Sequence, residues 1–286
     1  MNCFRERNEL RRMICTCAVL LFRHPIPNSI SYYPFRVLDK DDPTCLEFEP
    51  ITFLYGGNGS GKSTALNVIA EALKLDRDTL FNRGSFFEDY IDLCSFETSL
   101  EIPDNRRIIT SDDVFDYMLN MRMINDGIST QRELLFKDYI DRKYSSFKVN
   151  SVQDYESLKL SNSAKSRTQS KYVKSNLMLN VREHSNGESA LKYFTEKIED
   201  NGLYLLDEPE NSLSPERQLD LKKYIEDAAR FFSCQFIIAT HSPFLLSIKH
   251  AKIYDMEGRN VSVKKWNELS NVRIYQEFFK EHSNEF

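Results

Sequence analysis

The chain has 286 residues, of which 41% are apolar and 28% charged, so it can bury a sizeable core beneath a well-solvated surface. A net charge of -5 excludes a surface that is basic throughout and coats nucleic acid, although it allows a local basic face. Six scattered cysteines without a CxxC pair argue against a zinc site or a disulfide framework, and they favour reduced thiols in a cytoplasmic protein.

The first predicted element is an apolar stretch at residues 13–22, which follows four arginines. This order superficially resembles a signal peptide, but no small-residue cleavage site follows it. The stretch is also too short to cross a bilayer, which takes ~20 residues. We therefore expect a buried strand here and no membrane partner.

A second strand is predicted over residues 46–55, and it runs directly into a glycine-rich turn. A helix should follow over residues 62–75, because small and branched apolar residues recur on one of its faces. Residues 76–105 show no regular pattern, and a short strand follows from Arg106 to Thr110. Ser111 is predicted to cap the next helix, which carries acidic residues in its first turn.

The middle of the chain is polar and is interpreted mostly as helix and loop. We interpret residues 111–180 as a mainly helical lobe that is inserted into a single domain spanning residues 1–286. Three apolar strands are predicted after the lobe, at residues 202–208, 234–240 and 252–256. The expected fold class is α/β.

The turn after the second strand matches the phosphate-binding P-loop pattern and has the strand and helix that this pattern requires on either side. Its residues are Gly56, Gly57, Asn58, Gly59, Ser60, Gly61, Lys62, Ser63 and Thr64. Glycines let the backbone wrap around phosphate, and amide N–H groups at the start of the helix face the anion. We expect Lys62 to reach the β- and γ-phosphates of ATP and Ser63 to ligate Mg²⁺.

Two later strands each end in polar residues. Asp207 and Glu208 end the strand at 202–208, which predicts that Asp207 holds Mg²⁺ through water and that Glu208 polarises the attacking water. Adjacent acids also occur as simple strand ends. His241 follows the strand at 234–240, and we expect it to contact the γ-phosphate and the attacking water. A lone histidine is more often structural, but its place after the acidic pair favours this role.

The stretch Ser-Asn-Gly-Glu at 185–188 precedes a helix predicted over residues 188–199. Ser185 and the amide of Gly187 form a small anion-binding nest at the start of that helix. The spacing also fits an ordinary helix cap, with a serine three residues before a glutamate. Its position 22 residues before Asp207 favours phosphate binding.

Together these motifs resemble those of the ABC-type ATPase superfamily, with Ser-x-Gly-Glu as a shortened signature motif. The stretches LDEPENSLSP (206–215) and ATHSPFLL (239–246) look like those of small stand-alone bacterial AAA family ATPases. That group is similar to recombination and chromosome-maintenance heads and to the ATPases of some anti-phage systems. The resemblance covers about residues 45–258, strongly at both ends and weakly between them.

The resemblance implies a P-loop NTPase fold in the form of an ABC-ATPase-like head. It also implies a homodimer around two ATP molecules, in which each site joins the Walker motifs of one copy to the signature of the other. The residues around Ser212 would form the D-loop at this interface. The protein would then be an ATP-hydrolysing switch that acts with DNA or with an effector such as a nuclease, in DNA repair or anti-phage defence.

Two other functions stay open as alternatives. An ATPase subunit of a membrane transporter usually has a fuller Leu-Ser-Gly-Gly signature and a glutamine at the strand leading into the lobe, and this chain has neither. Ser111 or Asp112 replaces that glutamine unless both belong to a helix cap. A module that holds ATP without turnover is the other alternative, although Glu208 and His241 are both present.

The residue that contacts adenine is not evident from a motif. Tyr32, Tyr33 and Phe35 are candidates for stacking on the base, although core packing is the better interpretation of any one of them.

One segment of the lobe has an unusual charge. Between Glu156 and Glu183 there is no acidic residue, and the six basic residues are Lys159, Lys165, Arg167, Lys171, Lys174 and Arg182. We hypothesise that this segment contacts a nucleic-acid backbone or an acidic partner surface. The alternative is a solvated loop, which is favoured by the serines at positions Ser161, Ser163, Ser166, Ser170 and Ser175.

Overall fold

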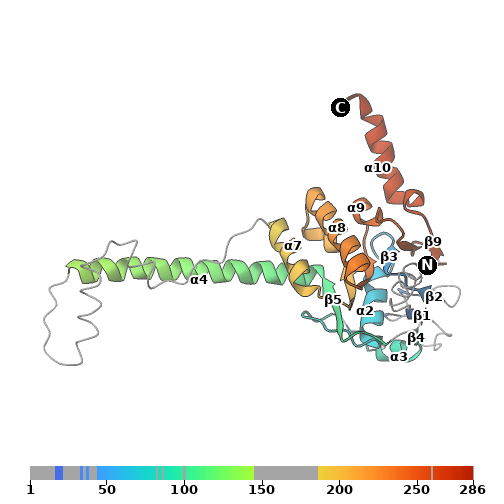
Figure 1. Cartoon of the computed structure of the whole chain (residues 1–286), viewed down its shortest axis with the longest axis horizontal. Coiled ribbons are helices and arrows are strands. Elements are labelled where there is room, and N and C mark those ends of the chain that lie inside the picture. The colour runs from blue at the N-terminus through green and yellow to red at the C-terminus, as the bar shows by residue number, and fades with distance from the viewer. Residues whose placement is uncertain are drawn as a thin grey trace, which may run out of the picture. The chain divides into compact units, whose positions relative to one another are not determined.

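The computed structural model describes residues 17–21, 33–34, 37–38, 44–81, 83–85, 87–98, 101–144, 186–258 and 260–285. The chain divides into two compact units. The first, here called the head, consists of Met1–Phe115 and Asn186–Phe286, and the second is Asp116–Ser185. Both sheets of the described residues belong to the head (Figure 1).

A six-stranded sheet forms the centre of the head, with strand order β5-β6-β7-β3-β8-β9. The strands are β3 (Ile51–Tyr55), β5 (Asn105–Thr110), β6 (Gly202–Asp207), β7 (Gln235–Ala239), β8 (Lys252–Asp255) and β9 (Ser262–Val263). All neighbours are parallel except β8 and β9. Every residue of β3 and β7 is buried, as expected for strands covered on both faces. The predicted α/β class is confirmed.

Helices cover this sheet (Figure 1). They include α2 (Lys62–Ala72), α7 (Asn186–Lys197), α8 (Pro215–Phe231) and the short α9 (Pro243–Leu246). α2 packs against β6 and β7, and α8 packs against α7, α9 and β7. The side chains of Ala65, Leu66 and Ile69 on α2 are fully buried, so this helix is anchored firmly behind the loop that precedes it. Strand, glycine-rich loop and buried helix form the predicted P-loop NTPase core.

A second, antiparallel sheet has strand order β2-β1-β4. Its strands are β1 (Cys17–Leu21), β2 (Thr44–Glu47) and β4 (Ser95–Thr98), and α3 (Phe87–Asp92) precedes β4. The prediction of one strand over residues 46–55 was wrong, because β2 and β3 lie in different sheets on either side of Pro50, which has no N–H group to donate. The prediction that residues 76–105 are irregular was also wrong, because α3 and β4 both lie within this range.

The helix α4 (Ser111–Tyr144) has 34 residues and starts where β5 ends. Ser111 was predicted to cap this helix, but it is the first residue of the helix. The cap is Thr110, whose hydroxyl accepts from the Asp113 N–H at 3.3 Å, while Asp113 Oδ2 accepts from the Thr110 N–H at 2.6 Å. This reciprocal pair is a capping box. From Asp116 onward α4 belongs to the second unit, and the basic segment of the lobe lies outside the described residues.

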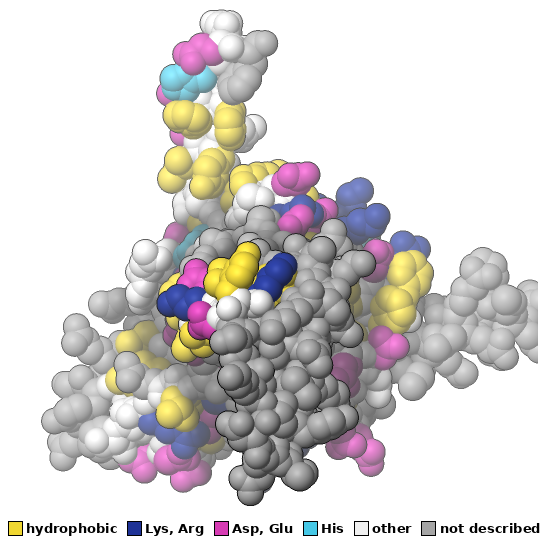
Figure 2. Space-filling view, turned by 90° about the vertical axis from the view of Figure 1, so that its left-hand side faces the viewer, with side chains coloured by type: hydrophobic (Ala, Val, Ile, Leu, Met, Phe, Trp, Pro, Cys, Tyr) yellow, Lys and Arg dark blue, Asp and Glu magenta, His cyan; other side chains and the backbone are white. Residues whose placement is uncertain are grey.

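The chain after β9 forms the short 3-10 helices η3 (Trp266–Glu268) and η4 (Ser283–Glu285) and, between them, α10 (Ser270–Glu281). Figure 1 shows α10 leading away from the sheet, and Figure 2 shows hydrophobic side chains along it. Only Val272 of this helix is buried. Nowhere in the described ranges is a helix both long enough and apolar enough to span a membrane.

Candidate nucleotide-binding site

The motifs that are far apart in the sequence meet at one edge of the central sheet. β7 lies between β3 and β6, and Ala239 near its end pairs with Leu54 on one side and Asp207 on the other. The strands are parallel, so their carboxyl ends lie at the same edge. The P-loop, the acidic pair and His241 each follow one of these three strands and are therefore brought together.

The P-loop at residues 56–64 joins β3 to α2. Gly59 and Gly61 have φ angles of 80° and 96°, in the left-handed region that glycine adopts without strain. A Cβ at Gly61 would lie 3.0 Å from a methyl group of Leu38, so a larger residue would also be crowded. The Ser60 hydroxyl is buried and has no hydrogen-bond partner among the described residues. A loop with an unused buried hydroxyl fits a bound phosphate.

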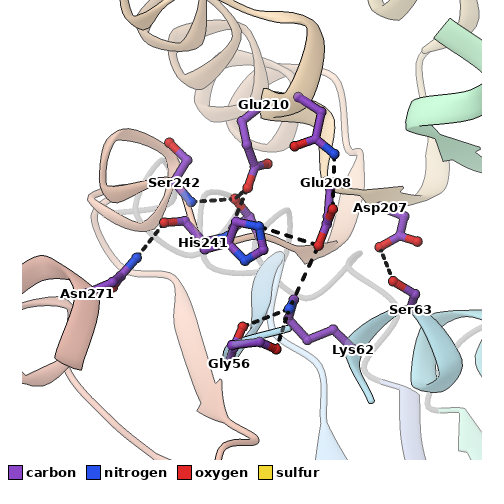
Figure 3. Close-up of polar contacts among 12 residues, drawn as sticks. Gly56, Lys62, Ser63, Asp207, Glu208, Glu210, His241, Ser242 and Asn271 are labelled. Atoms are coloured by element: carbon purple, nitrogen blue, oxygen red, sulfur yellow. Dashed lines mark hydrogen bonds and ion pairs between the residues drawn. The ribbon is translucent and has the colours of Figure 1, made fainter. Parts of the chain in front are cut away.

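Lys62 lies inside this loop. Its Nζ donates to the carbonyl oxygens of Gly56 at 2.7 Å and Gly57 at 3.1 Å (Figure 3). The side chain is only 4% exposed, and its Nζ is 3.9 Å from Glu208 Oε1. The ammonium group thus lies where an anion bound in the loop would meet it.

Ser63 and Asp207 form the second contact between the P-loop and β6. Ser63 Oγ donates to Asp207 Oδ1 at 2.9 Å. Burial raises the pKa of Asp207 to about 6, and the charge of nearby Glu208 adds to the rise, whereas the Ser63 hydrogen bond opposes it.

These two oxygen atoms fit a magnesium ion. Mg²⁺ prefers oxygen ligands and is commonly bound by one or two protein groups together with waters and substrate phosphates. No group of three or more His, Cys, Asp or Glu side chains in the described part of the chain could hold a metal by itself. A magnesium ion here would therefore depend on Ser63, Asp207 and the phosphates of a bound nucleotide.

Glu208 has an unusual backbone conformation, with φ 48° and ψ 53° in the left-handed region. Its Oε1 lies 3.9 Å from Lys62 Nζ and 3.5 Å from His241 Nε2, and its Oε2 accepts from Asn211 Nδ2 at 3.0 Å. The side chain is 26% exposed. A carboxylate that has three nitrogen groups within 4 Å and still reaches solvent is suited to orienting a water molecule.

The backbone of His241 is held on both sides (Figure 3). Its N–H donates to Glu210 Oε1 at 2.9 Å, and its carbonyl accepts from Asn271 Nδ2 at 2.5 Å. Glu210, on the 3-10 helix η2 (Pro209–Ser212), also accepts from the buried Thr240 hydroxyl at 2.7 Å. Neither Glu210 nor Asn271 was predicted to belong to the site. Glu210 could have been noticed as another acid two residues after Glu208, whereas no motif marks Asn271.

The structure describes one of the two predicted signature residues, Gly187, and Ser185 lies outside the described residues. α7 begins at Asn186, two residues earlier than predicted, so Gly187 lies in its first turn. A Cβ there would meet Arg217 Cγ at 3.4 Å and the Ser212 carbonyl oxygen at 4.0 Å, and among the described residues no further atom outside its own helical turn lies within 4 Å. Gly187 therefore lies beside η2 and not against the P-loop of its own chain.

The end of β5 also lies beside the site, because Thr110 pairs with Asp207 in register. Either Ser111 or Asp112 was predicted to replace the missing glutamine, with helix capping as the alternative. Asp112 is exposed, and the capping box consists of Thr110 and Asp113. Thr110 and Asp113 thus form the helix cap, and the replacement of the glutamine by Ser111 or Asp112 stays a prediction.

Of the three candidates for stacking on adenine, the structure describes Tyr33, while Tyr32 and Phe35 lie outside the described residues. The ring of Tyr33 stacks on Phe87, with the ring centroids 5.9 Å apart and the planes at 19°. Tyr33 also packs against the buried core that contains Phe87. Its ring therefore serves core packing.

Comparison with protein-family models matches residues 186–246 to the AAA ATPase domain. Among solved structures, a nucleotide-free ATP-binding cassette from an ABC transporter is 14% identical, with 91% of this chain and 96% of that chain covered and a TM-score of 0.48. The SMC head domain from Thermotoga maritima is 13% identical, with 88% and 98% covered and a TM-score of 0.41. A search of curated proteins found no match.

The match to the family model agrees with the predicted resemblance to AAA family ATPases. The matched span 186–246 contains Asp207, Glu208 and His241. Both TM-scores are below 0.5, so the interpretation of the site depends on the contacts of its own residues.

Proposed function

We propose that this protein is an ATP-hydrolysing molecular switch. The observation that carries the proposal is the position of Glu208, which lies 3.5 Å from His241 and 3.9 Å from Lys62 at the mouth of a P-loop. A carboxylate beside a phosphate-binding lysine and a histidine has the neighbours that general-base attack of water on a phosphate requires.

Each group at the sheet edge has a role in this proposal. The amides of the P-loop and the Lys62 ammonium bind the phosphates, and Ser63 and Asp207 would hold Mg²⁺, which would neutralise negative charge on the phosphates. Glu208 orients the attacking water and accepts its proton. His241 Nε2, on the other side of the carboxylate, contacts the same water and the γ-phosphate.

We further propose that two copies of the chain close around two ATP molecules. The support is the position of Gly187, beside η2 and away from the P-loop of its own chain. A helix start with a small residue is suited to a phosphate brought by a second copy. Such a contact would be two-fold symmetric, so that the same surface is used twice.

The closed dimer would act in the cytoplasm with DNA or with an effector protein such as a nuclease. The support is the acid-free basic segment between Glu156 and Glu183. Capture experiments with ATP and vanadate would show what the closed state binds. Replacing Lys165, Arg167 and Lys171 with glutamine should flatten the salt dependence of DNA binding by up to ~3 in log–log slope. If the wild type binds no DNA in a salt-sensitive manner, a protein partner becomes the better proposal.

The enzymatic proposal is tested by phosphate release from radiolabelled ATP with Mg²⁺ or with EDTA. Slow release that requires Mg²⁺ is expected, and its absence under all conditions would contradict the proposal. Light scattering of Glu208→Gln with and without ATP tests dimerisation separately, because this variant should keep bound ATP.

A further inference from the structure

We propose that Asn271, at the start of α10, is a positioning residue that sets the place of His241 opposite Glu208. The proposal rests on the proposed role of His241 in ATP hydrolysis. It assigns a function to the segment that follows β9, in which the sequence motifs place no part of the site.

The contact that carries the proposal is the hydrogen bond from Asn271 Nδ2 to the His241 carbonyl, at 2.5 Å. The N–H of the same histidine donates to Glu210 Oε1 at 2.9 Å. His241 is thus fixed at both of its peptide groups, by a residue from η2 and one from α10. Its ring Nε2 lies 3.5 Å from Glu208 Oε1, so a shift of the peptide would change this separation directly.

The start of α10 is itself fixed against the strand that carries the P-loop. The Asn271 N–H donates to the hydroxyl of Tyr55 at 3.2 Å, and that hydroxyl is 2.7 Å from Ser270 Oγ. Ser270 Oγ in turn donates to Glu257 Oε2 at 3.2 Å. Tyr55 is the last residue of β3, is 2% exposed and directly precedes Gly56. Asn271 therefore ties the position of His241 to the strand from which the P-loop starts.

The amide group of Asn271 is what this contact needs. A carboxylate of the same shape at residue 271 would bring an acceptor against the His241 carbonyl, and two acceptors repel each other. An apolar side chain would leave that carbonyl without its donor. Both changes keep the position occupied while they remove the hydrogen bond.

The decisive variant is Asn271→Asp, assayed at pH 8 so that the new carboxylate is ionised. We expect kcat for ATP hydrolysis to fall about 10-fold, within the range of up to ~10² that a 1 Å misplacement can cost. The KM for ATP should stay within about twofold, because the P-loop amides and Lys62 are unchanged. Asn271→Leu removes the hydrogen-bond donor without adding charge. It takes the place of Asn271→Asp in the same assay if the aspartate variant does not fold.

Gln276→Glu is the matched control. It makes the same change from amide to carboxylate on the same helix, at an exposed position. It should leave kcat and KM unchanged. An equal loss of kcat in both variants would mean that added charge on α10 is the cause, and this would overturn the proposal.

A double-mutant cycle tests whether Asn271 acts through His241. Once His241→Ala has removed the imidazole, adding Asn271→Asp should change kcat less than about twofold, because residues that act through one another are not additive. A further 10-fold loss in that background would show that Asn271 acts independently of His241, contrary to the proposal.

The contact has a readout that does not depend on turnover. In protein with isotope-labelled histidines, the His241 ring resonances, assigned by their loss in His241→Ala, should shift in Asn271→Asp and not in Gln276→Glu. If the wild type does not hydrolyse ATP, the proposed function has failed, while this shift still tests the positioning contact. Unmoved ring resonances in both Asn271 variants would overturn the proposal.

Discussion

The two halves of the candidate site differ in how much of their environment one chain supplies. In the Walker half, Ser63 contacts Asp207, and Glu208 lies between Lys62 and His241. In the signature half, a Cβ at Gly187 would have only Arg217 and a backbone oxygen within 4 Å among the described residues. We interpret the Walker half as a set of residues that one chain already brings together. We interpret the signature half as a surface that is completed by a second copy of the chain. Substitutions in the Walker half should therefore impair ATP binding or turnover, whereas substitutions in the signature half should impair dimerisation.

The largest effect is expected from Glu208→Gln in the Walker half. The amide keeps the shape of the side chain but cannot accept a proton, so kcat should fall by roughly 10²–10⁴-fold while ATP still binds. Glu216→Gln, at an exposed position in the first turn of α8, is the control. Phosphate release from radiolabelled ATP measures both. Unchanged turnover in Glu208→Gln would remove Glu208 from the mechanism.

Lys62→Ala should act on binding in the same half. The substitution removes the ammonium group from the loop, and a lost hydrogen bond to a charged group costs ~1.5–3 kcal/mol, or roughly 10- to 150-fold in ATP affinity. Titration with a fluorescent ATP analogue measures this loss. Lys192→Ala, a partly exposed lysine of α7, should bind like the wild type. Equal affinities for all three proteins would contradict the assignment of the P-loop.

Gly187→Glu tests the signature half. Within one chain the change should be tolerated, because acids are favourable near the start of a helix by ~0.3–1 kcal/mol and Arg217 lies nearby. Against a phosphate brought by a second copy, the new carboxylate is repulsive, so ATP-dependent dimerisation should weaken about 10-fold or more.

Light scattering with ATP and thermal unfolding without it separate these two expectations for Gly187→Glu. Thr195→Glu, at an exposed position farther along α7, is the control and should dimerise normally. A Gly187→Glu protein that dimerises as readily as its parent would break the contrast between the two halves.

The last expected effect concerns the stability of the nucleotide-free protein. The folded-state pKa of Asp207 is raised to about 6, so the ionised form is disfavoured by folding. The wild type should therefore lose stability relative to Asp207→Asn as the pH rises from 4 through 6, by about 1–3 kcal/mol in total.

Urea unfolding at pH 4.5 and pH 8, without Mg²⁺, measures the Asp207 effect. Asp104→Asn, at an exposed position, should show no such pH-dependent gain. If the difference between Asp207→Asn and the wild type is the same at both pH values, the environment of Asp207 does not penalise its charge.

Much of the Walker half could be predicted because its signals are local. Glycines before Lys62, and acids or a histidine directly after apolar strands, are short patterns, and the parallel order of the strands then brings them together. The contacts of Glu210 and Asn271 could not be predicted in this way. Each joins polar residues about 30 positions apart, and no periodic pattern reports such a pairing.

The errors in the fold have a related cause. Apolar alternation shows that residues 46–55 are extended, but it does not show that the chain changes sheets at Pro50. α3 and β4 are too short, at six and four residues, for a period to stand out. Thr110, not Ser111, caps α4 because its partner Asp113 lies three residues on, which is the spacing of a capping box.

The backbone conformation of Glu208 implies a conflict between durability and activity at one position. A residue with a side chain in the left-handed region costs roughly 1–2 kcal/mol, which glycine would not incur. Glycine at this position would thus relieve the backbone strain and remove the carboxylate at once. In laboratory evolution that selects for heat tolerance alone, we expect Glu208→Gly to be enriched. In evolution that also selects for ATP turnover, we expect it to be lost.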